Sequence, residues 1–168
     1  MDEQEHVIVC GVDGTPASER ALAWAIDEAA RRGCALRAVT AWSWDGMEDL
    51  GAAANAADAL KRAQAVQDKA VDAAIAAAEK APDVERLLPR GVPSEVLCIA
   101  ALDAELVVLG SHGHGQVHER IVGSTSQRVI HHATCAVVVL PDPRHADRER
   151  SKRRGAEPPL APFRAMSI

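Results

Sequence analysis

Short apolar runs alternate with longer amphipathic segments along the first 141 residues of the chain. The runs have the length of buried strands and are rich in Val, Ile and Leu, whereas the segments between them repeat apolar positions at helical spacing. This alternation is typical of an α/β domain with a parallel sheet. The runs expected to form strands are residues 7–12, 35–41, 84–88, 105–109 and 136–140.

The segments between the runs carry helix signals. Thr15, which is followed by proline, marks the start of the first helix, and Gly33 marks its end. A long alanine-rich helix is expected over residues 52–81, and its thin apolar stripe predicts a position at the surface. Two shorter helices are expected to begin near Ser94 and at Ser124.

A glycine-rich segment follows the fourth predicted strand. Gly110 and Gly113 come directly after this strand, and Gly123 precedes three hydroxyl residues at the start of a helix. Glycines let a backbone approach a ligand, hydroxyls donate to phosphate oxygens, and helix N-termini carry partial positive charge. The pattern predicts a phosphate-binding loop. The alternative is that the glycines only form a tight turn and that Ser124 only caps its helix.

Asp13 follows the first predicted strand. Parallel sheets bind ligands outside the carboxyl ends of their strands, at the point where the strand order reverses. If the first and fourth strands are neighbours there, Asp13 faces the glycine-rich segment, and its carboxylate could hold a ribose hydroxyl or a Mg²⁺ ion. The alternative is an Asx turn ahead of the helix.

Other nucleotide and catalytic motifs do not match. Neither Gly110 nor Gly115 is followed by the lysine that a P-loop requires. The dinucleotide-binding fingerprint fails because His118 stands at its third glycine position and because the loop follows the fourth strand instead of the first. Ser124 lacks the G-x-S-x-G context of a nucleophile. We therefore predict no catalytic residue.

Histidines and tryptophans near the predicted loop allow two interpretations each. His112 and His114 have the spacing of a metal pair, but few acidic or Cys ligands lie nearby, so solvated or phosphate-adjacent histidines are the favoured interpretation. Trp42 and Trp44 follow the second strand and could cover a ligand. Packing beside the alanine-rich helix is the favoured interpretation for them, because large apolar side chains are usually packing residues.

Charge and composition exclude some partners. Residues 1–141 carry 12 Lys and Arg against 20 Asp and Glu, and the chain has one Phe, three Trp and no Tyr. An acidic body with few aromatic side chains argues against nucleic-acid binding. Residues 142–168 carry 7 Lys and Arg against 4 Asp and Glu among several prolines, which predicts a disordered tail, with a nucleic-acid or membrane arm as the alternative.

The N-terminus, the apolar runs and the cysteines indicate in which cellular compartment the protein is expected. The acidic N-terminus lacks the regions of a signal peptide, and no run is long and apolar enough to span a bilayer, so we expect a cytoplasmic protein without a membrane partner. The four cysteines have no C-x-x-C or zinc spacing, and each lies among apolar residues, which predicts buried thiols. They are Cys10, Cys34, Cys98 and Cys135.

Taken together, the motifs resemble those of the universal stress proteins. The family motif G-x-x-G-x(9)-G-[S/T] is matched by Gly110, Gly113, Gly123 and Ser124. The resemblance extends over residues 7–141. It also includes the segments Val12-Asp13-Gly14-Thr15, Gly91 before the third helix, and His131-His132-Ala133-x-Cys135.

The resemblance implies an α/β three-layer sandwich with a five-stranded parallel sheet in the order 3-2-1-4-5, like the adenine nucleotide alpha hydrolases. It implies one domain over residues 1–141, outside which the tail of residues 142–168 falls. It also implies a homodimer formed through the last strand, and ATP bound with Mg²⁺ or Mn²⁺.

Carried over position by position, the resemblance implies a nucleotide site. Asp13 would meet the ribose or the metal, and the backbone of Ala41 would line the adenine. The residues implied to contact the nucleotide are Asp13, Thr15, Ala41, Gly110, Gly113, His114, Gly123, Ser124, Thr125 and Ser126. The chain departs from the family at Ala136, often Pro in relatives, and at Glu119, which would repel a triphosphate unless Arg120 or a metal compensates.

Together these expectations predict a cytoplasmic stress-response protein in which bound ATP sets the conformation or the choice of a protein partner. The sequence does not identify that partner. Two alternatives stay open. One is a nucleotide-free dimeric interaction module, and the other is slow ATP hydrolysis at the same site, for which the sequence offers no general base.

Overall fold

The computed structural model describes residues 6–45, 55–111 and 122–141. Its strands are β1 (Val7–Gly11), β2 (Ala35–Val39), β3 (Val84–Leu87), β4 (Leu106–Gly110) and β5 (Ala136–Leu140). Its helices are α1 (Pro16–Arg32), α2 (Ala56–Ala77), α3 (Pro93–Ala100) and α4 (Ser124–His132). The tail predicted for residues 142–168 lies outside the described residues, so its disorder stays a prediction.

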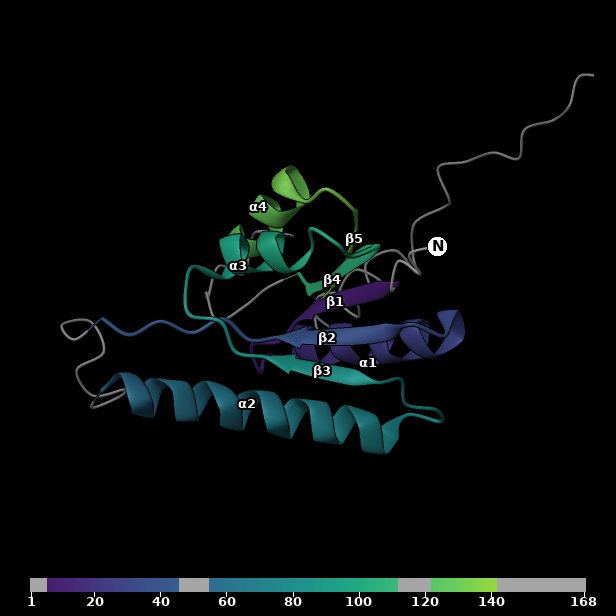
Figure 1. Cartoon of the computed structure of the whole chain (residues 1–168), viewed down its shortest axis with the longest axis horizontal. Coiled ribbons are helices and arrows are strands. Elements are labelled where there is room, and N and C mark those ends of the chain that lie inside the picture. Colours follow the sequence, from purple (N-terminus) through teal and green to yellow (C-terminus); the bar gives the residue numbers. More distant parts are fainter. Residues whose placement is uncertain (1–5, 46–54, 112–121, 142–168) are drawn as a thin grey trace, which may run out of the picture.

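The strands form one parallel sheet in the order β3-β2-β1-β4-β5, which confirms the predicted topology (Figure 1). β1 lies at the centre, and its Ile8 is paired with Leu36 of β2 on one side and with Leu106 of β4 on the other. The chain moves outward from β1 to β2 and β3, then returns to β4. The strand order therefore reverses between β1 and β4, where ligand sites of this architecture form.

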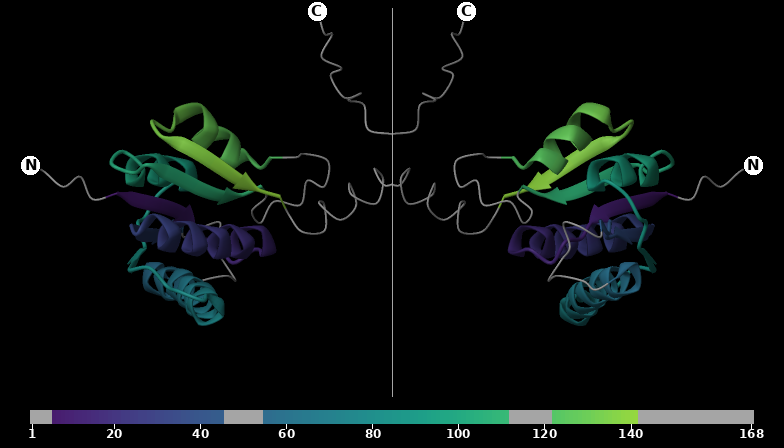
Figure 2. Two further views of the ribbon diagram at one scale, coloured as in Figure 1. Left: turned by 90° about the vertical axis from the view of Figure 1, so that its right-hand side faces the viewer. Right: turned by 90° about the vertical axis from the view of Figure 1, so that its left-hand side faces the viewer.

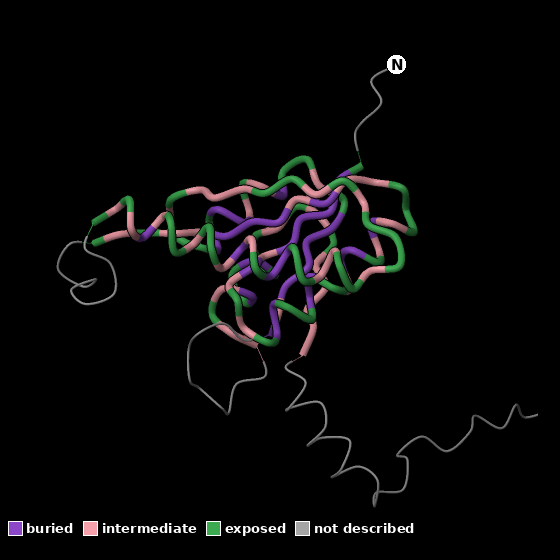
Figure 3. The backbone as a smooth tube through the Cα atoms, turned by 90° about the horizontal axis from the view of Figure 1, so that it is seen from below, coloured by how far each residue is buried: buried purple, intermediate pink, exposed green. Residues whose placement is uncertain are grey.

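Two apolar cores cover the two faces of the sheet. Ile8 and Cys10 of β1 point into a core shared with α1 and α2, whereas Val7 and Val9 point into a core shared with α3 and α4. Successive side chains of a strand face opposite sides, so a sheet covered on both faces needs a continuous apolar run. The three layers are visible in Figure 2, and Figure 3 shows the buried stretches of the chain in the interior, with exposed stretches around them.

The first helix follows its sequence signals closely. Thr15 is the N-cap of α1 and accepts a hydrogen bond from the backbone N–H of Ser18, with proline at the first helical position. Gly33 ends the helix with φ of 69°, a left-handed conformation that glycine adopts at little cost. No helix among the described residues is long and apolar enough to cross a membrane.

One helix start and one predicted cap differ from the prediction. α2 begins at Ala56 instead of residue 52, because the side chain of Asn55 caps it by accepting from the N–H of Asp58. α3 begins at Pro93, which confirms a start near Ser94, and α4 begins at Ser124 as predicted. The N-cap of α4 is Gly123, without a side-chain hydrogen bond, so the interpretation of Ser124 as the cap is wrong.

Candidate functional site

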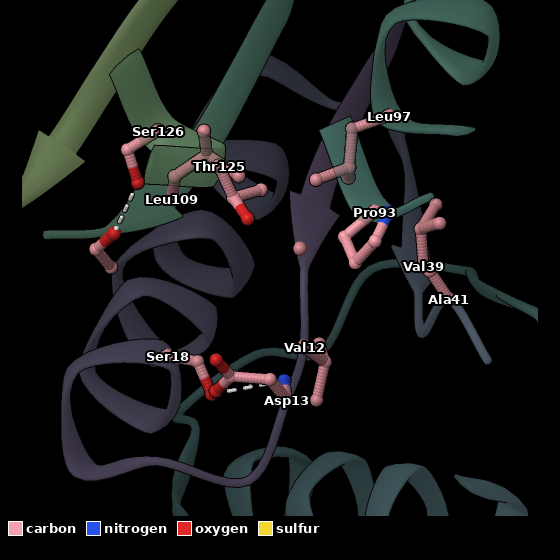
Figure 4. Close-up of a pocket in the computed structure, with 12 residues that line it drawn as sticks. Val12, Asp13, Ser18, Val39, Ala41, Pro93, Leu97, Leu109, Thr125 and Ser126 are labelled. Atoms are coloured by element: carbon pink, nitrogen blue, oxygen red, sulfur yellow. Dashed lines mark hydrogen bonds between the residues drawn. The ribbon is translucent and has the colours of Figure 1, made fainter. Parts of the chain in front are cut away.

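A pocket opens at the carboxyl ends of β1, β2 and β4, where the strand order reverses (Figure 4). Its volume of about 310 Å³ lies at the lower end of the range typical of small-molecule sites. Asp13 lies on one side, Thr125 and Ser126 lie on the opposite side, and Ala41 lies on a third side. The pocket is lined by Gly11, Val12, Asp13, Ser18, Val39, Ala41, Pro93, Leu97, Leu109, Gly110, Thr125 and Ser126.

Asp13 is held by the first turn of α1. Its Oδ1 accepts from the backbone N–H of Thr15 at 2.9 Å and from the Thr15 hydroxyl at 2.6 Å. The backbone N–H of Asp13 donates to Ser18 Oγ at 3.3 Å. The Asx-turn interpretation is thus confirmed, but Asp13 also lines the pocket. One carboxylate therefore orders the turn and lines the pocket.

Gly110 lets β4 approach α1 closely. A Cβ atom at this position would lie 2.6 Å from the carbonyl carbon of Ala17 and 2.8 Å from the backbone nitrogen of Ser18. Real side chains do not reach backbone atoms at these distances, so only glycine fits without a shift of the helix. The packing of α1 against β4 therefore explains why residue 110 is glycine. The same close approach of helix and strand places Gly110 in the wall of the pocket.

The two ends of the predicted phosphate-binding loop meet at the end of β4. The backbone N–H of Gly123 donates to the carbonyl oxygen of Ser111. Ser126 Oγ donates to the carbonyl oxygen of Gly110 at 2.8 Å. These bonds fix the N-terminus of α4 beside the pocket, and the first turn of α4 contains no acidic residue. Backbone N–H groups at such a helix start favour an anion.

The tryptophan after β2 belongs to the edge of the sheet. Trp42 Nε1 donates to the carbonyl oxygen of Leu88 at 2.9 Å, and the guanidinium of Arg90 lies 5.7 Å from the centroid of its ring. The backbone N–H of Trp42 also donates to the carbonyl oxygen of Pro89. Neither Trp42 nor Trp44 is among the described residues that line the pocket. These contacts place Trp42 against the segment that follows β3, and packing beside the alanine-rich helix stays a prediction.

The pocket brings together five of the residues implied by the family resemblance: Asp13, Ala41, Gly110, Thr125 and Ser126. Thr15, Gly123 and Ser124 lie at the adjoining helix starts but do not line it. Gly113 and His114 lie outside the described residues, as do His112, Glu119 and Arg120. The roles of these residues toward a ligand stay predictions.

Sequence reasoning missed the apolar wall of the pocket. Pro93 and Leu97 of α3 lie on the same side as Val39, and Leu109 lies toward the N-terminus of α4 (Figure 4). A signal for the α3 residues was present, since a helix that follows the third parallel strand must start at the carboxyl edge of the sheet. Apolar side chains with a few polar groups are typical of small-molecule pockets.

Asp13 is the one ionisable side chain among the described lining residues. It also lies near Cys10, whose pKa is raised above its ordinary value mainly by burial and further by the Asp13 charge. Partial burial raises the pKa of Cys34, Cys98 and Cys135 as well. All four described thiols are free, but only Cys10 is fully buried, so the prediction of buried thiols is wrong for the other three. These thiols are protonated near neutral pH, so they are poor nucleophiles. No group of three potential metal ligands is found within the described residues.

Comparison with known proteins decides the family. The model of the universal stress protein family matches residues 6–141, a range that includes every described residue. The chain belongs to the universal stress protein family. A universal stress protein of Mycobacterium tuberculosis is 36% identical over 143 residues, which cover 82% of this chain and 46% of that protein. The chain therefore spans about half the length of the curated relatives it matches.

Solved universal stress protein structures share the fold. One, in complex with cAMP, has a TM-score of 0.65 and 28% identity, and the alignment covers 82% of this chain and 97% of that chain. Another, from Lactobacillus plantarum, has a TM-score of 0.62 and 24% identity, with 81% of this chain and 97% of that chain covered. The second likeness supports the fold alone.

Proposed function

We propose that this universal stress protein binds an adenine nucleotide, ATP with Mg²⁺ or Mn²⁺, in the pocket between Asp13 and the N-terminus of α4. The bound nucleotide would set the conformation or partner choice of a stress-response module. The observation that carries the proposal is the placement of a carboxylate and an uncapped helix start on opposite sides of one pocket. A related structure in complex with cAMP supports the nucleotide class.

The apolar wall suits a nucleobase. Val39, Pro93 and Leu97 supply apolar surface, and the backbone of Ala41 supplies polar groups at the end of β2. A nucleobase is a flat ring system with hydrogen-bonding edges, so it needs this combination of an apolar surface and a few fixed polar groups. Asp13 is placed to accept from ribose hydroxyls or to contact a divalent ion.

The charge of the pocket predicts a metal requirement for a triphosphate. The described lining contributes one carboxylate and no Lys or Arg side chain. The helix N-terminus supplies only about half a positive charge, which does not balance ATP. A divalent ion has hard-cation chemistry that suits Asp13 and phosphate oxygens, and it would lower the repulsion between them.

Binding of ATP is the first expected result. We expect calorimetry to show a one-to-one complex whose affinity falls at least about tenfold when EDTA replaces Mg²⁺, because of the charge imbalance. Mass spectrometry of freshly purified, denatured protein is expected to show copurified nucleotide. Absence of both heat and thermal shift at millimolar ATP and cAMP would contradict the proposal and favour the nucleotide-free interaction module. Release of phosphate that Asp13→Ala abolishes would instead favour the slow ATPase.

We also propose that two copies pair through β5, the edge strand next to β4. β5 is apolar throughout and none of its residues is fully buried, a pattern that leaves an edge strand open to another chain. Val139→Lys is expected to shift a dimer to monomer in analytical ultracentrifugation, because a dimer interface would bury the new charge. Ile99→Lys, at an apolar residue exposed on α3, is the matched control. A monomeric wild type, or a Val139→Lys variant that stays dimeric, would exclude this interface.

A further inference from the structure

Gln67 of α2 is a buried amide that ties this helix to the sheet. It is 0% exposed. Its Nε2 donates to the carbonyl oxygens of Ala38 and Leu87 at 2.9 Å each and lies 3.2 Å from Thr40 Oγ1. These acceptors belong to the carboxyl ends of β2 and β3, the strands farthest from β5. One side chain thus connects a helix with two neighbouring strand ends.

Thr40 extends this contact to the pocket. Its hydroxyl donates to the carbonyl oxygen of Val12 at 2.8 Å, so its lone pairs are left to accept from Gln67. The backbone N–H of Val12 in turn donates to the carbonyl oxygen of Val39. Val12 and Val39 line the pocket, and Thr40 is buried between Val39 and Ala41. Gln67, Thr40 and Val12 therefore form a relay from α2 to the pocket wall.

A second contact brings α2 to the same turn. Gly14, next to Asp13, has φ of 78°, and a Cβ atom there would lie 2.7 Å from Cγ1 of Val66. Val66 precedes Gln67 on α2, so consecutive residues of this helix reach the β1–α1 turn, one directly and one through Thr40. A movement of α2 at this point would move both the turn and the end of β2.

Packing alone does not account for an amide at position 67. Gln67 Oε1 is buried without a hydrogen-bond partner among the described residues. A buried polar atom without a partner is costly, and an apolar side chain of similar size would avoid that cost. The contribution of the amide therefore lies in its acceptors, the carbonyl oxygens of Ala38 and Leu87 and the Thr40 hydroxyl, which share the two hydrogens of its NH₂ group.

We propose that Gln67 is a positioning residue for the nucleobase wall of the pocket, acting through Thr40 on residues 39–41. This inference rests on the proposed nucleotide binding and extends it. It assigns recognition of the base to the relay, whereas the phosphates would bind at the N-terminus of α4. Loss of the relay should then weaken discrimination between bases more than it weakens contacts with phosphate.

The test is Gln67→Met, which keeps the length of the side chain and removes the amide. Gln64→Met, at an exposed glutamine of the same helix, is the matched control. We expect ATP affinity to fall about tenfold in Gln67→Met and the ratio of ATP to GTP affinity to fall with it, while Gln64→Met matches the wild type. In hydrogen–deuterium exchange of the nucleotide-free protein, the amides of Val12 and Thr40 should exchange faster in Gln67→Met only.

Thr40→Val provides a second variant that retains shape and removes the relay hydroxyl. It should reproduce the loss of base discrimination, and the double variant should lose less than the sum of the two, because both changes break one relay. Faster exchange with unchanged discrimination between ATP and GTP would show a structural role only and overturn the proposal. If the wild type binds no nucleotide, the proposed function fails, and unchanged exchange in Gln67→Met would separately overturn the relay.

Discussion

Gly110→Ala is expected to lower the free energy of unfolding by about 2–3 kcal/mol, near the upper end of the range for overpacking a close contact. The added methyl group would lie 2.6–2.9 Å from Ala17 and Ser18 atoms, two of which are backbone. Helix backbone cannot rotate away as a side chain does, so α1 must shift as a whole. Urea denaturation followed by circular dichroism measures this change.

A matched control is available on the neighbouring strand. Gly11 ends β1 as Gly110 ends β4, but a Cβ atom there would meet Cδ2 of Leu109 at 2.8 Å, the far end of a flexible side chain. We expect Gly11→Ala to cost less than half as much as Gly110→Ala, since Leu109 can change rotamer. Equal stability losses in the two variants would contradict the assignment of Gly110 to the close approach of α1.

Thr125→Asp is expected to have opposite effects on folding and on nucleotide binding. A carboxylate in the first turn of α4 should stabilise the helix by about 0.3–1 kcal/mol through its dipole. The same carboxylate would lie where the proposal places the phosphates. Two like charges about 4 Å apart repel by about 4 kcal/mol at an effective dielectric constant of 20. We therefore expect ATP affinity to fall at least about a hundredfold while the melting temperature stays level or rises.

Thr125→Asn serves as the neutral control of similar shape, and adenosine serves as the ligand without phosphate. Calorimetry should show that the two variants bind adenosine equally and that only Thr125→Asp loses ATP. If Thr125→Asp binds ATP as tightly as Thr125→Asn, the phosphates do not lie at the N-terminus of α4. A fall in the melting temperature of Thr125→Asp alone would instead indicate a distorted helix start.

Elements with local signals were predicted well. Thr15 and Gly33 specify both ends of α1 through contacts within a few residues, and the apolar runs specify the strands because both faces of the sheet are covered. The start of α2 was predicted less well, since the cap at Asn55 stands among alanines that favour a helix on either side. The expected strand order followed from the family resemblance and not from local pattern.

Gln67 shows which structural features a helical sequence pattern predicts and which it does not. Gln67 lies four residues after Ala63 and three before Ala70, so it lies beside the predicted apolar stripe of α2 without being part of it. The helical pattern did not predict the burial of this polar side chain, and it gives no sign of its partners. Those partners are Ala38, Thr40 and Leu87, which are 20 to 29 residues away in the chain.

The sequence by itself determined the alternation of strands and helices, the cap of α1 and the candidate phosphate-binding residues, because these features depend on neighbours along the chain. Only the tertiary structure decided why Gly110 must be glycine, which apolar residues face Asp13, and how α2 reaches the pocket. Each of these depends on atoms that are distant in sequence and close in space. Local pattern fixes which face of an element is buried, but packing alone decides what that face touches.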